Sequence, residues 1–114
     1  MLEHFFIQLS TEPDSISFEQ SISLIDALYD FTPVAFQNGE QANAAGQNSG
    51  ACKILAFGQL HQLSASQTLF LFGDYYRAVL DNPRGDDHQN IRNFIRTGWD
   101  GVEFSAQALT AKAP

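Results

Sequence analysis

The sequence has little of what would tie a protein to a membrane or to an oxidising compartment. Its one cysteine, Cys52, excludes an intrachain disulfide and fits a reducing compartment. No segment approaches the ~20 apolar residues that a membrane helix needs. The first residues, 1–7, show neither the basic region nor the long apolar run of a secretory signal peptide. We therefore expect a cytoplasmic protein.

Basic residues are also scarce. Six Lys and Arg stand against thirteen Asp and Glu, which gives a net charge of -7. Such a chain repels a phosphate backbone and an anionic lipid surface, so we expect no nucleic acid and no membrane as partner. The simplest role of the charge is to keep the protein soluble. A basic partner protein or a bound cation stays open as an alternative.

Aromatic and aliphatic residues, in contrast, are plentiful. Hydrophobic residues make up 44% of the chain, ten of them Phe, and only 17% of the residues are charged. This composition is typical of a globular protein rather than a disordered one. A chain of this length buries roughly two-thirds of its unfolded surface, enough for one core. We expect a single domain that spans residues 1–114.

Apolar residues recur at helical spacing in about five segments. The expected helices cover roughly residues 2–12, 17–30, 51–63, 64–80 and 86–97. Ser17 with Gln20 and Ser64 with Gln67 predict capping boxes at two helix starts. Asp86 or Asp87 is expected to cap the last helix, which Gly98 should end. The helix over 51–63 is apolar most of the way round and is expected to lie at the centre.

Two short runs have the character of strands. Residues 32–37 contain Pro33, which restricts them to an edge or a strand start, and residues 102–108 alternate apolar and polar side chains. Neither run can leave its backbone groups unpaired, so we expect them to pair antiparallel. The predicted class is α+β, mainly α-helical, with about five helices and a small two-stranded antiparallel sheet.

Residues 38–50 form an amide-rich loop without any large apolar residue. Asn38-Gly39 predicts a turn at its start. A loop of this length in a compact domain is either functional or mobile. Asn and Gln side chains can bind a small polar ligand, or they can hold an irregular loop together by bonding its own backbone.

Three blocks of the sequence resemble the HopJ type III effector family. They are Asn38-Gly39 with residues 43–48 and Cys52-Lys53, then residues 72–77, and then residues 85–94 followed by Gly98-Trp99-Asp100-Gly101. The resemblance implies a bacterial protein. It also implies either export by a type III secretion system or, since similar proteins are widespread in bacteria, a housekeeping role. The family brings no agreed catalytic residues, and its members often have a hydroxyl residue where this chain has Ala51.

Cys52 and His88 form one candidate catalytic pair. Cys52 would act as a nucleophile near a helix N-terminus, with His88 as its base and Asp86, Asp87 or Asn90 orienting the imidazole. The alternative is a buried structural thiol beside a packed histidine. We expect that Cys52 is not a nucleophile, because burial among apolar residues raises a thiol pKa.

A metal site is a further alternative. Asp86, Asp87 and His88, with His61, have suitable ligand atoms, but their spacing fits no zinc or calcium pattern. We therefore expect no metal and no cofactor.

Polar residues of the loop and of the last helix make the preferred candidate site. Arg92 follows His88 by one helical turn, and both the helix start and the loop need hydrogen-bond partners. We expect the loop to pack against this helix start and form one polar cluster. The candidate binding residues are Asn38, Asn43, Asn48, Asp87, His88, Asn90 and Arg92.

The resulting functional hypothesis is a non-enzymatic binding or regulatory domain whose partner is a small polar ligand or a protein. A small hydrolase or transferase built on Cys52 and His88 is the second hypothesis. A type III secreted effector that binds a host protein is the third.

Overall fold

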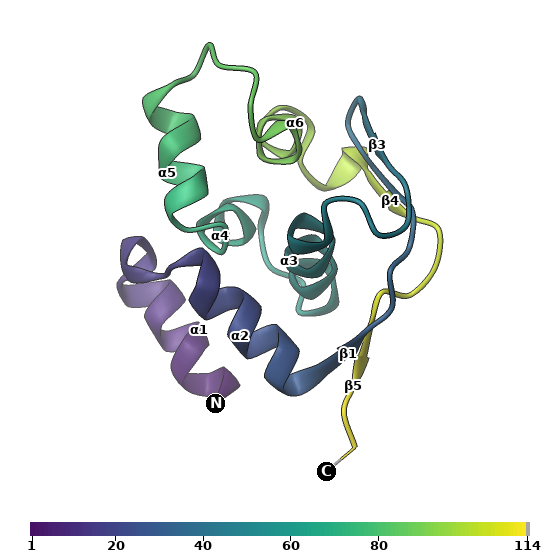
Figure 1. Ribbon diagram of the computed structural model, residues 1–114. Helices are drawn as coiled ribbons and strands as arrows, with labels where there is room; N and C mark the ends of the chain where they lie inside the picture. The colour runs from purple at the N-terminus through teal and green to yellow at the C-terminus, as the bar shows by residue number, and fades with distance from the viewer. Residues whose placement is uncertain (114) are drawn as a thin grey trace.

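The computed structural model describes residues 1–113 and is mainly helical (Figure 1). Six α-helices and two short 3-10 helices make up most of these residues. The α-helices are α1 (Leu2–Thr11), α2 (Phe18–Leu28), α3 (Ser49–Leu60), α4 (Ala65–Phe70), α5 (Asp74–Asp81) and α6 (Gln89–Thr97). The 3-10 helices are η1 (Pro13–Ser15) and η2 (Gly98–Gly101).

Five three-residue strands form two small antiparallel sheets on one side of the helices (Figure 1). They are β1 (Tyr29–Phe31), β2 (Phe36–Asn38), β3 (Gln41–Asn43), β4 (Val102–Phe104) and β5 (Leu109–Ala111). The order β3-β2-β4 makes one sheet, and β1 pairs with β5 in the other. The predicted α+β class and the predicted pairing of 32–37 with 102–108 are confirmed, since Phe36 lies opposite Phe104.

The sequence predicted one sheet of two strands, but residues 1–113 contain a two-stranded and a three-stranded sheet. β1, β3 and β5 were missed because three residues are too few to show a period of two, and β3 is polar. The turn at Asn38-Gly39 is confirmed and closes the β2–β3 hairpin, with Gly39 at φ +60°. A Cβ at Gly39 would lie 2.8 Å from Oδ1 of Asn93, so the hairpin tip contacts α6 closely.

Helix α3 lies at the centre of the core, as its apolar pattern predicted. Ile54, Leu55 and Phe57 are fully buried. Phe5 of α1 meets the Phe57 ring edge to face at 6.2 Å. Burying a large apolar side chain contributes roughly 1.5–3 kcal/mol, so this helix anchors the elements around it.

The segment predicted as one helix over 64–80 is two helices, α4 and α5, with a break at Gly73. Gly73 has φ +58°, and a Cβ there would lie 2.5 Å from the backbone nitrogen of Phe18. The apolar stripe continues across the break, which is why periodicity alone predicted one helix. The turn brings the start of α5 against the start of α2.

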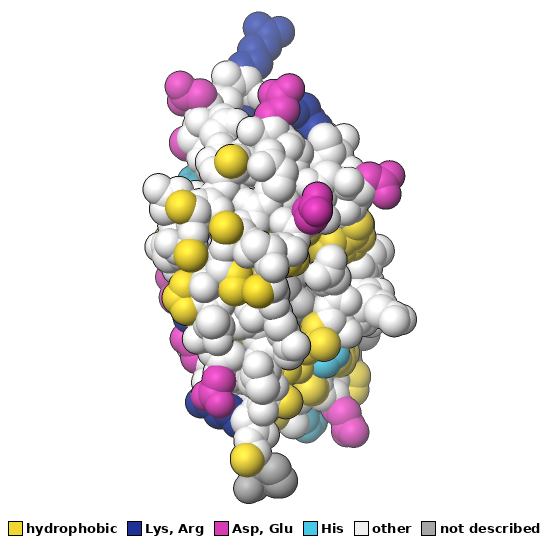
Figure 2. All heavy atoms as spheres, turned by 90° about the vertical axis from the view of Figure 1, so that its right-hand side faces the viewer, with side chains coloured by type: hydrophobic (Ala, Val, Ile, Leu, Met, Phe, Trp, Pro, Cys, Tyr) yellow, Lys and Arg dark blue, Asp and Glu magenta, His cyan; other side chains and the backbone are white. Residues whose placement is uncertain are grey.

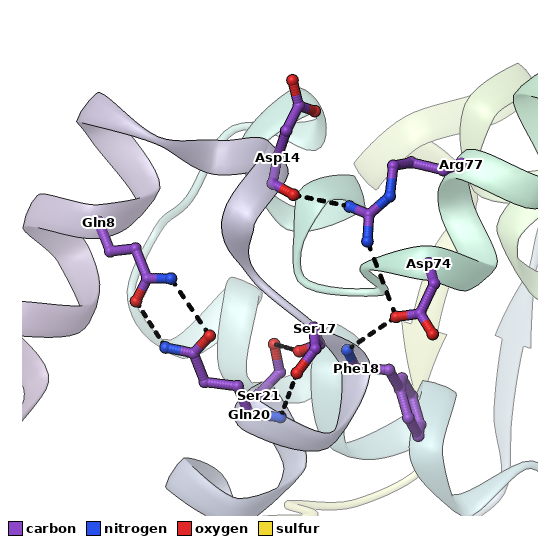
Figure 3. Close-up of polar contacts among 8 residues, drawn as sticks. All are labelled: Gln8, Asp14, Ser17, Phe18, Gln20, Ser21, Asp74 and Arg77. Atoms are coloured by element: carbon purple, nitrogen blue, oxygen red, sulfur yellow. Dashed lines mark hydrogen bonds and ion pairs between the residues drawn. The ribbon is translucent and has the colours of Figure 1, made fainter.

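A polar network holds these two helix starts together (Figure 3). Oδ1 of Asp74 accepts the Phe18 amide at 3.5 Å and pairs with Arg77 at 3.8 Å. Arg77 also donates to the Asp14 carbonyl at 3.1 Å. These contacts fix the backbone of Phe18 and thereby the position of its side chain.

The face that carries the sheets shows Asp and Glu side chains scattered singly, with no acidic patch (Figure 2). Within residues 1–113, no helix has the length and apolar character to span a membrane.

Candidate ligand-binding site

A pocket of about 540 Å³ lies where five segments of the chain meet. Its size falls within the ~300–1,000 Å³ typical of small-molecule sites. The lining comes from the starts of α2, α3 and α6, from strand β3, and from the turn between α4 and α5 with the first residues of α5. The lining residues are Phe18, Gln41, Asn48, Gly50, Ala51, Phe72, Tyr75, His88, Gln89, Asn90 and Ile91.

Aromatic rings form one part of the lining. Phe18 and Tyr75 meet edge to face at 4.9 Å, and the Tyr75 and His88 rings lie 5.2 Å apart with a tilt of 41°. Phe72 is buried at 3% exposure, whereas Tyr75 is 39% exposed. Gly50 makes room for this arrangement, because a Cβ there would approach the Phe18 ring to 2.7 Å.

The starts of α3 and α6 both border this pocket. Each helix follows a residue in the left-handed region, Asn48 at φ 53° and His88 at φ 50°. Neither residue caps its helix with its side chain, and neither first turn carries an acidic residue. Helices leave their first amides without an intrahelical acceptor. The pocket is lined by the first-turn residues Gly50, Ala51, Gln89, Asn90 and Ile91.

His88, rather than Asp86 or Asp87, is thus the N-cap residue of α6, which corrects the sequence-based expectation. An aspartate cap needs extended backbone and a carboxylate directed at the helix amides. The Asp87 carboxylate instead pairs with Arg92. Of the two predicted capping boxes, the one of Ser64 with Gln67 is confirmed in full. At Ser17 only half of the box forms: the Ser17 hydroxyl accepts the Gln20 amide, but the Gln20 side chain bonds the Gln8 side chain instead.

Three buried asparagines connect the hairpin β2–β3 to α6. Asn43 and Asn90 exchange side-chain hydrogen bonds of 2.9 and 3.2 Å. Asn38 donates to the carbonyl of Asn90 at 2.7 Å. Asn48 donates to Oδ1 of Asn43 at 2.7 Å. These amides hold two pocket residues, Asn48 and Asn90, in fixed positions.

Arg92 and Asp87 brace the loop that precedes α6. Arg92 is 6% exposed and pairs with the Asp87 carboxylate at 2.6 Å. It also donates to the carbonyls of Asp87 at 2.6 Å and of Asn82 at 2.9 Å. The hydrogen bond from Arg92 and the nearby His88 charge lower the pKa of Asp87 below its usual value.

The predicted single polar cluster is therefore divided in two. Asn38, Asn43, Asn48 and Asn90 form one hydrogen-bonded group, and Asp87 with Arg92 forms another; within residues 1–113 no hydrogen bond joins them. His88 lies with the second group, because its Nε2 is 3.9 Å from Oδ2 of Asp87, the carboxylate that pairs with Arg92. The loop does contact the start of α6, through Asn90.

Cys52 lies apart from the pocket lining. Its side chain is buried at 1% exposure, and burial raises the pKa of its thiol. His61 lies at the end of α3, where it shares a 2.6 Å hydrogen bond with the Tyr29 hydroxyl, and burial lowers its pKa. Within residues 1–113 no three side chains among His, Cys, Asp and Glu come close enough to hold a metal ion.

Comparison with known families accounts for nearly the whole chain. A family model described as HopJ type III effector protein matches residues 2–109. The chain belongs to the HopJ family. A crystal structure described as that of an unknown function protein, VPA0580, superposes on this HopJ chain with a TM-score of 0.96 and 50% sequence identity. That match covers 98% of this chain and 94% of the other, while no curated protein matches.

Sequence reasoning missed the aromatic side of the pocket lining in this HopJ chain. Asn48, His88 and Asn90 were singled out because they are polar residues beside apolar helices. Phe18, Phe72 and Tyr75 give no such signal, since an apolar side chain at helical spacing is most often core. Only the break at Gly73 brings them to the pocket. The Gly73-Asp74 step was the available signal, as an isolated Gly in a helical pattern lowers confidence in one continuous helix.

Proposed function

We propose that the chain is a non-enzymatic binding domain that holds a small polar ligand in the pocket between the starts of α3 and α6. The observation that carries the proposal is the convergence on one cavity of aromatic rings, side-chain amides and His88 from separate segments. A large pocket with a few convergent polar groups is the feature on which small-molecule sites are built.

The candidate binding residues take two roles in this proposal. Asn48, His88 and Asn90 line the pocket and contact the ligand. Asn38 and Asn43 hold the amides of the lining in place, and Asp87 with Arg92 holds the loop that carries His88. A site held by hydrogen bonds beneath its lining is pre-organised, which lowers the entropy lost on binding.

A thermal-shift screen against a library of small polar metabolites tests the proposal. A ligand at 100 times its Kd stabilises the folded state by about 2.7 kcal/mol. We expect at least one compound to raise the Tm of the wild type and to lose its effect on the variant Ala51→Leu, which fills the pocket. Ala56→Leu on the same helix lies outside this pocket and serves as the matched control. Shifts that survive Ala51→Leu would contradict the proposal.

The Cys52–His88 hydrolase or transferase gains no support from this geometry. A nucleophile needs an exposed thiolate, whereas Cys52 is buried and its pKa is raised. We expect a thiol reagent to modify Cys52 slowly under native conditions at neutral pH and rapidly after unfolding in denaturant. Fast native labelling would restore the catalytic hypothesis.

The family description supports the third hypothesis, a secreted effector that acts on a host protein. We propose residence in the bacterial cytoplasm instead, for which the single buried thiol is compatible with a reducing compartment. The full chain carrying a C-terminal reporter, expressed in bacteria with and without a working type III apparatus, distinguishes the two. Reporter in the medium only when the apparatus works would establish export.

A further inference from the structure

We infer that the pocket takes a planar, uncharged heterocycle of the nucleobase class, bound by stacking on Tyr75 and by hydrogen bonds from the surrounding amides. This inference rests on the proposed function and names the ligand chemistry of the same site. Three independent features of the lining carry it: the ring row, the side-chain amides and the lack of charged partners.

The first feature is the row of rings Phe18–Tyr75–His88. The contact of Phe18 with Tyr75 is edge to face, and the rings of Tyr75 and His88 are tilted by 41°, so no two rings of the row cover one another face to face. Tyr75 is also 39% exposed. An exposed aromatic face beside a cavity suits a flat ligand, because every base has a π face and stacking on an aromatic side chain contributes binding energy.

The second feature is a set of three side-chain amides around the same cavity, from Gln41, Asn48 and Gln89. Each donates one N–H to an acceptor within the protein, and a carboxamide with two donors and one acceptor keeps further positions for a ligand. The fourth amide of the lining, Asn90, is taken up by Asn38 and Asn43. The edge of a nucleobase presents donors and acceptors side by side, and Asn or Gln can pair with it through two hydrogen bonds. Aliphatic ligands lack such an edge.

The third feature concerns charge. The pocket lining contains no Lys, Arg, Asp or Glu, and its titratable side chains are His88 and Tyr75. A ligand with several charges would thus find no side-chain counter-ion. The backbone amides at the starts of α3 and α6 can donate to ring carbonyl oxygens instead. A free base or its nucleoside fits this lining, which agrees with a protein whose charge of -7 repels polynucleotides.

The test compares uracil with 5,6-dihydrouracil on the whole chain by NMR titration of the backbone amides, with adenine as a second planar probe. Uracil and dihydrouracil share the same amide edge, but only uracil has an aromatic, flat ring. We expect uracil or adenine to bind at about 1 mM or below. Dihydrouracil should bind at least about fivefold more weakly than uracil, since stacking is lost.

Two variants locate the binding. Tyr75→Leu keeps an apolar side chain but removes the ring, and should weaken binding by about tenfold. Tyr75→Phe keeps the ring and should bind like the wild type, because the Tyr75 hydroxyl makes no hydrogen bond within residues 1–113. Equal binding of uracil and dihydrouracil, or an unchanged affinity in Tyr75→Leu, overturns the inference.

The outcomes also separate this inference from the proposed function. If a library compound binds and is lost in Ala51→Leu while uracil and adenine do not bind at all, the nucleobase inference fails and the binding function stands. If uracil binds equally well to Ala51→Leu, its site lies elsewhere and the nucleobase inference fails, whereas the binding function fails only if every stabilising library compound keeps its effect on Ala51→Leu.

Discussion

Helices of this protein begin in two different ways. α2 and α4 begin on serines in extended backbone, and the Ser17 and Ser64 hydroxyls accept the amides of Gln20 and Gln67 at 3.0 Å. α3 and α6 begin on Asn48 and His88 in the left-handed region, with no side-chain cap. The first pair satisfies its helix amides within the protein. The second pair has no side-chain cap, and residues of both first turns line the pocket.

The comparison shows that the serine-capped helix starts add to the stability of the fold, whereas the starts at Asn48 and His88 reduce it. A serine cap contributes about 1 kcal/mol, whereas a left-handed non-glycine residue costs about 1–2 kcal/mol. Asn48 and His88 are two of the three non-glycine residues with positive φ within residues 1–113. Backbone in unfavourable regions is concentrated at functional sites, and both of these positions border the same pocket.

The largest expected effect comes from the asparagines that support the pocket helices. Asn90→Leu removes the partner of Asn43 and one acceptor of Asn38, both buried. Buried polar groups without partners cost about 1–3 kcal/mol each, so we expect the free energy of unfolding to fall by roughly 2–4 kcal/mol. Denaturant unfolding measures the change.

Ile95→Ala, at an exposed position of the same helix, is the matched control and should change stability little. A loss below about 1 kcal/mol in Asn90→Leu would mean that the asparagine group does not hold the pocket.

These asparagines also show what sequence reasoning can and cannot reach. Apolar periodicity predicted the helices and the central place of α3, because burial of a helix face follows directly from spacing. It could not show that Asn38 and Asn43 are more buried than many apolar residues, since their burial depends on partners 47 to 52 residues away. The pocket was predicted only on its polar side, for its aromatic side requires the break at Gly73.

A smaller effect is expected at the capped helix starts. Ser64→Ala removes the hydroxyl that accepts the Gln67 amide and should lower the free energy of unfolding by about 1 kcal/mol. Ser66→Ala, exposed in the first turn of the same helix, should be neutral or slightly stabilising, as Ala has the higher helix propensity. Thermal and denaturant unfolding compare the two. Equal effects would remove the distinction between capped and open helix starts.

Almost no change in stability is expected at the uncapped start of α6. His88→Gly relieves the left-handed backbone, and this gain offsets the greater entropy of glycine in the unfolded chain. Stability should stay within about 0.5 kcal/mol of the wild type, while ligand affinity falls because a pocket side chain is lost. If unfolding shows a loss above about 1 kcal/mol, His88 is a structural cap and the comparison of helix starts fails.

The smallest effect concerns pH and the brace beneath His88. The hydrogen bond from Arg92 lowers the pKa of Asp87 in the folded protein below the ordinary value of an aspartate. A lowered carboxyl pKa contributes stability above the unfolded value, and this contribution is lost as pH falls through the folded pKa. Asp87→Asn should therefore be less stable than the wild type at pH 6 and converge with it near pH 2. A constant difference at all pH values would mean that the ion pair with Arg92 is not the source.

The most direct measurement of the central claim is a backbone-amide NMR titration with the compound that gives the largest thermal shift in the metabolite screen. We expect the amides of Ser49, Gly50, Ala51, Gln89, Asn90 and Ile91 to shift together and saturably. The capped start of α4 at Gln67, which does not line the pocket, should stay unchanged. Shifts confined to other surfaces, with both open helix starts unaffected, would contradict the assignment of the pocket as the ligand site.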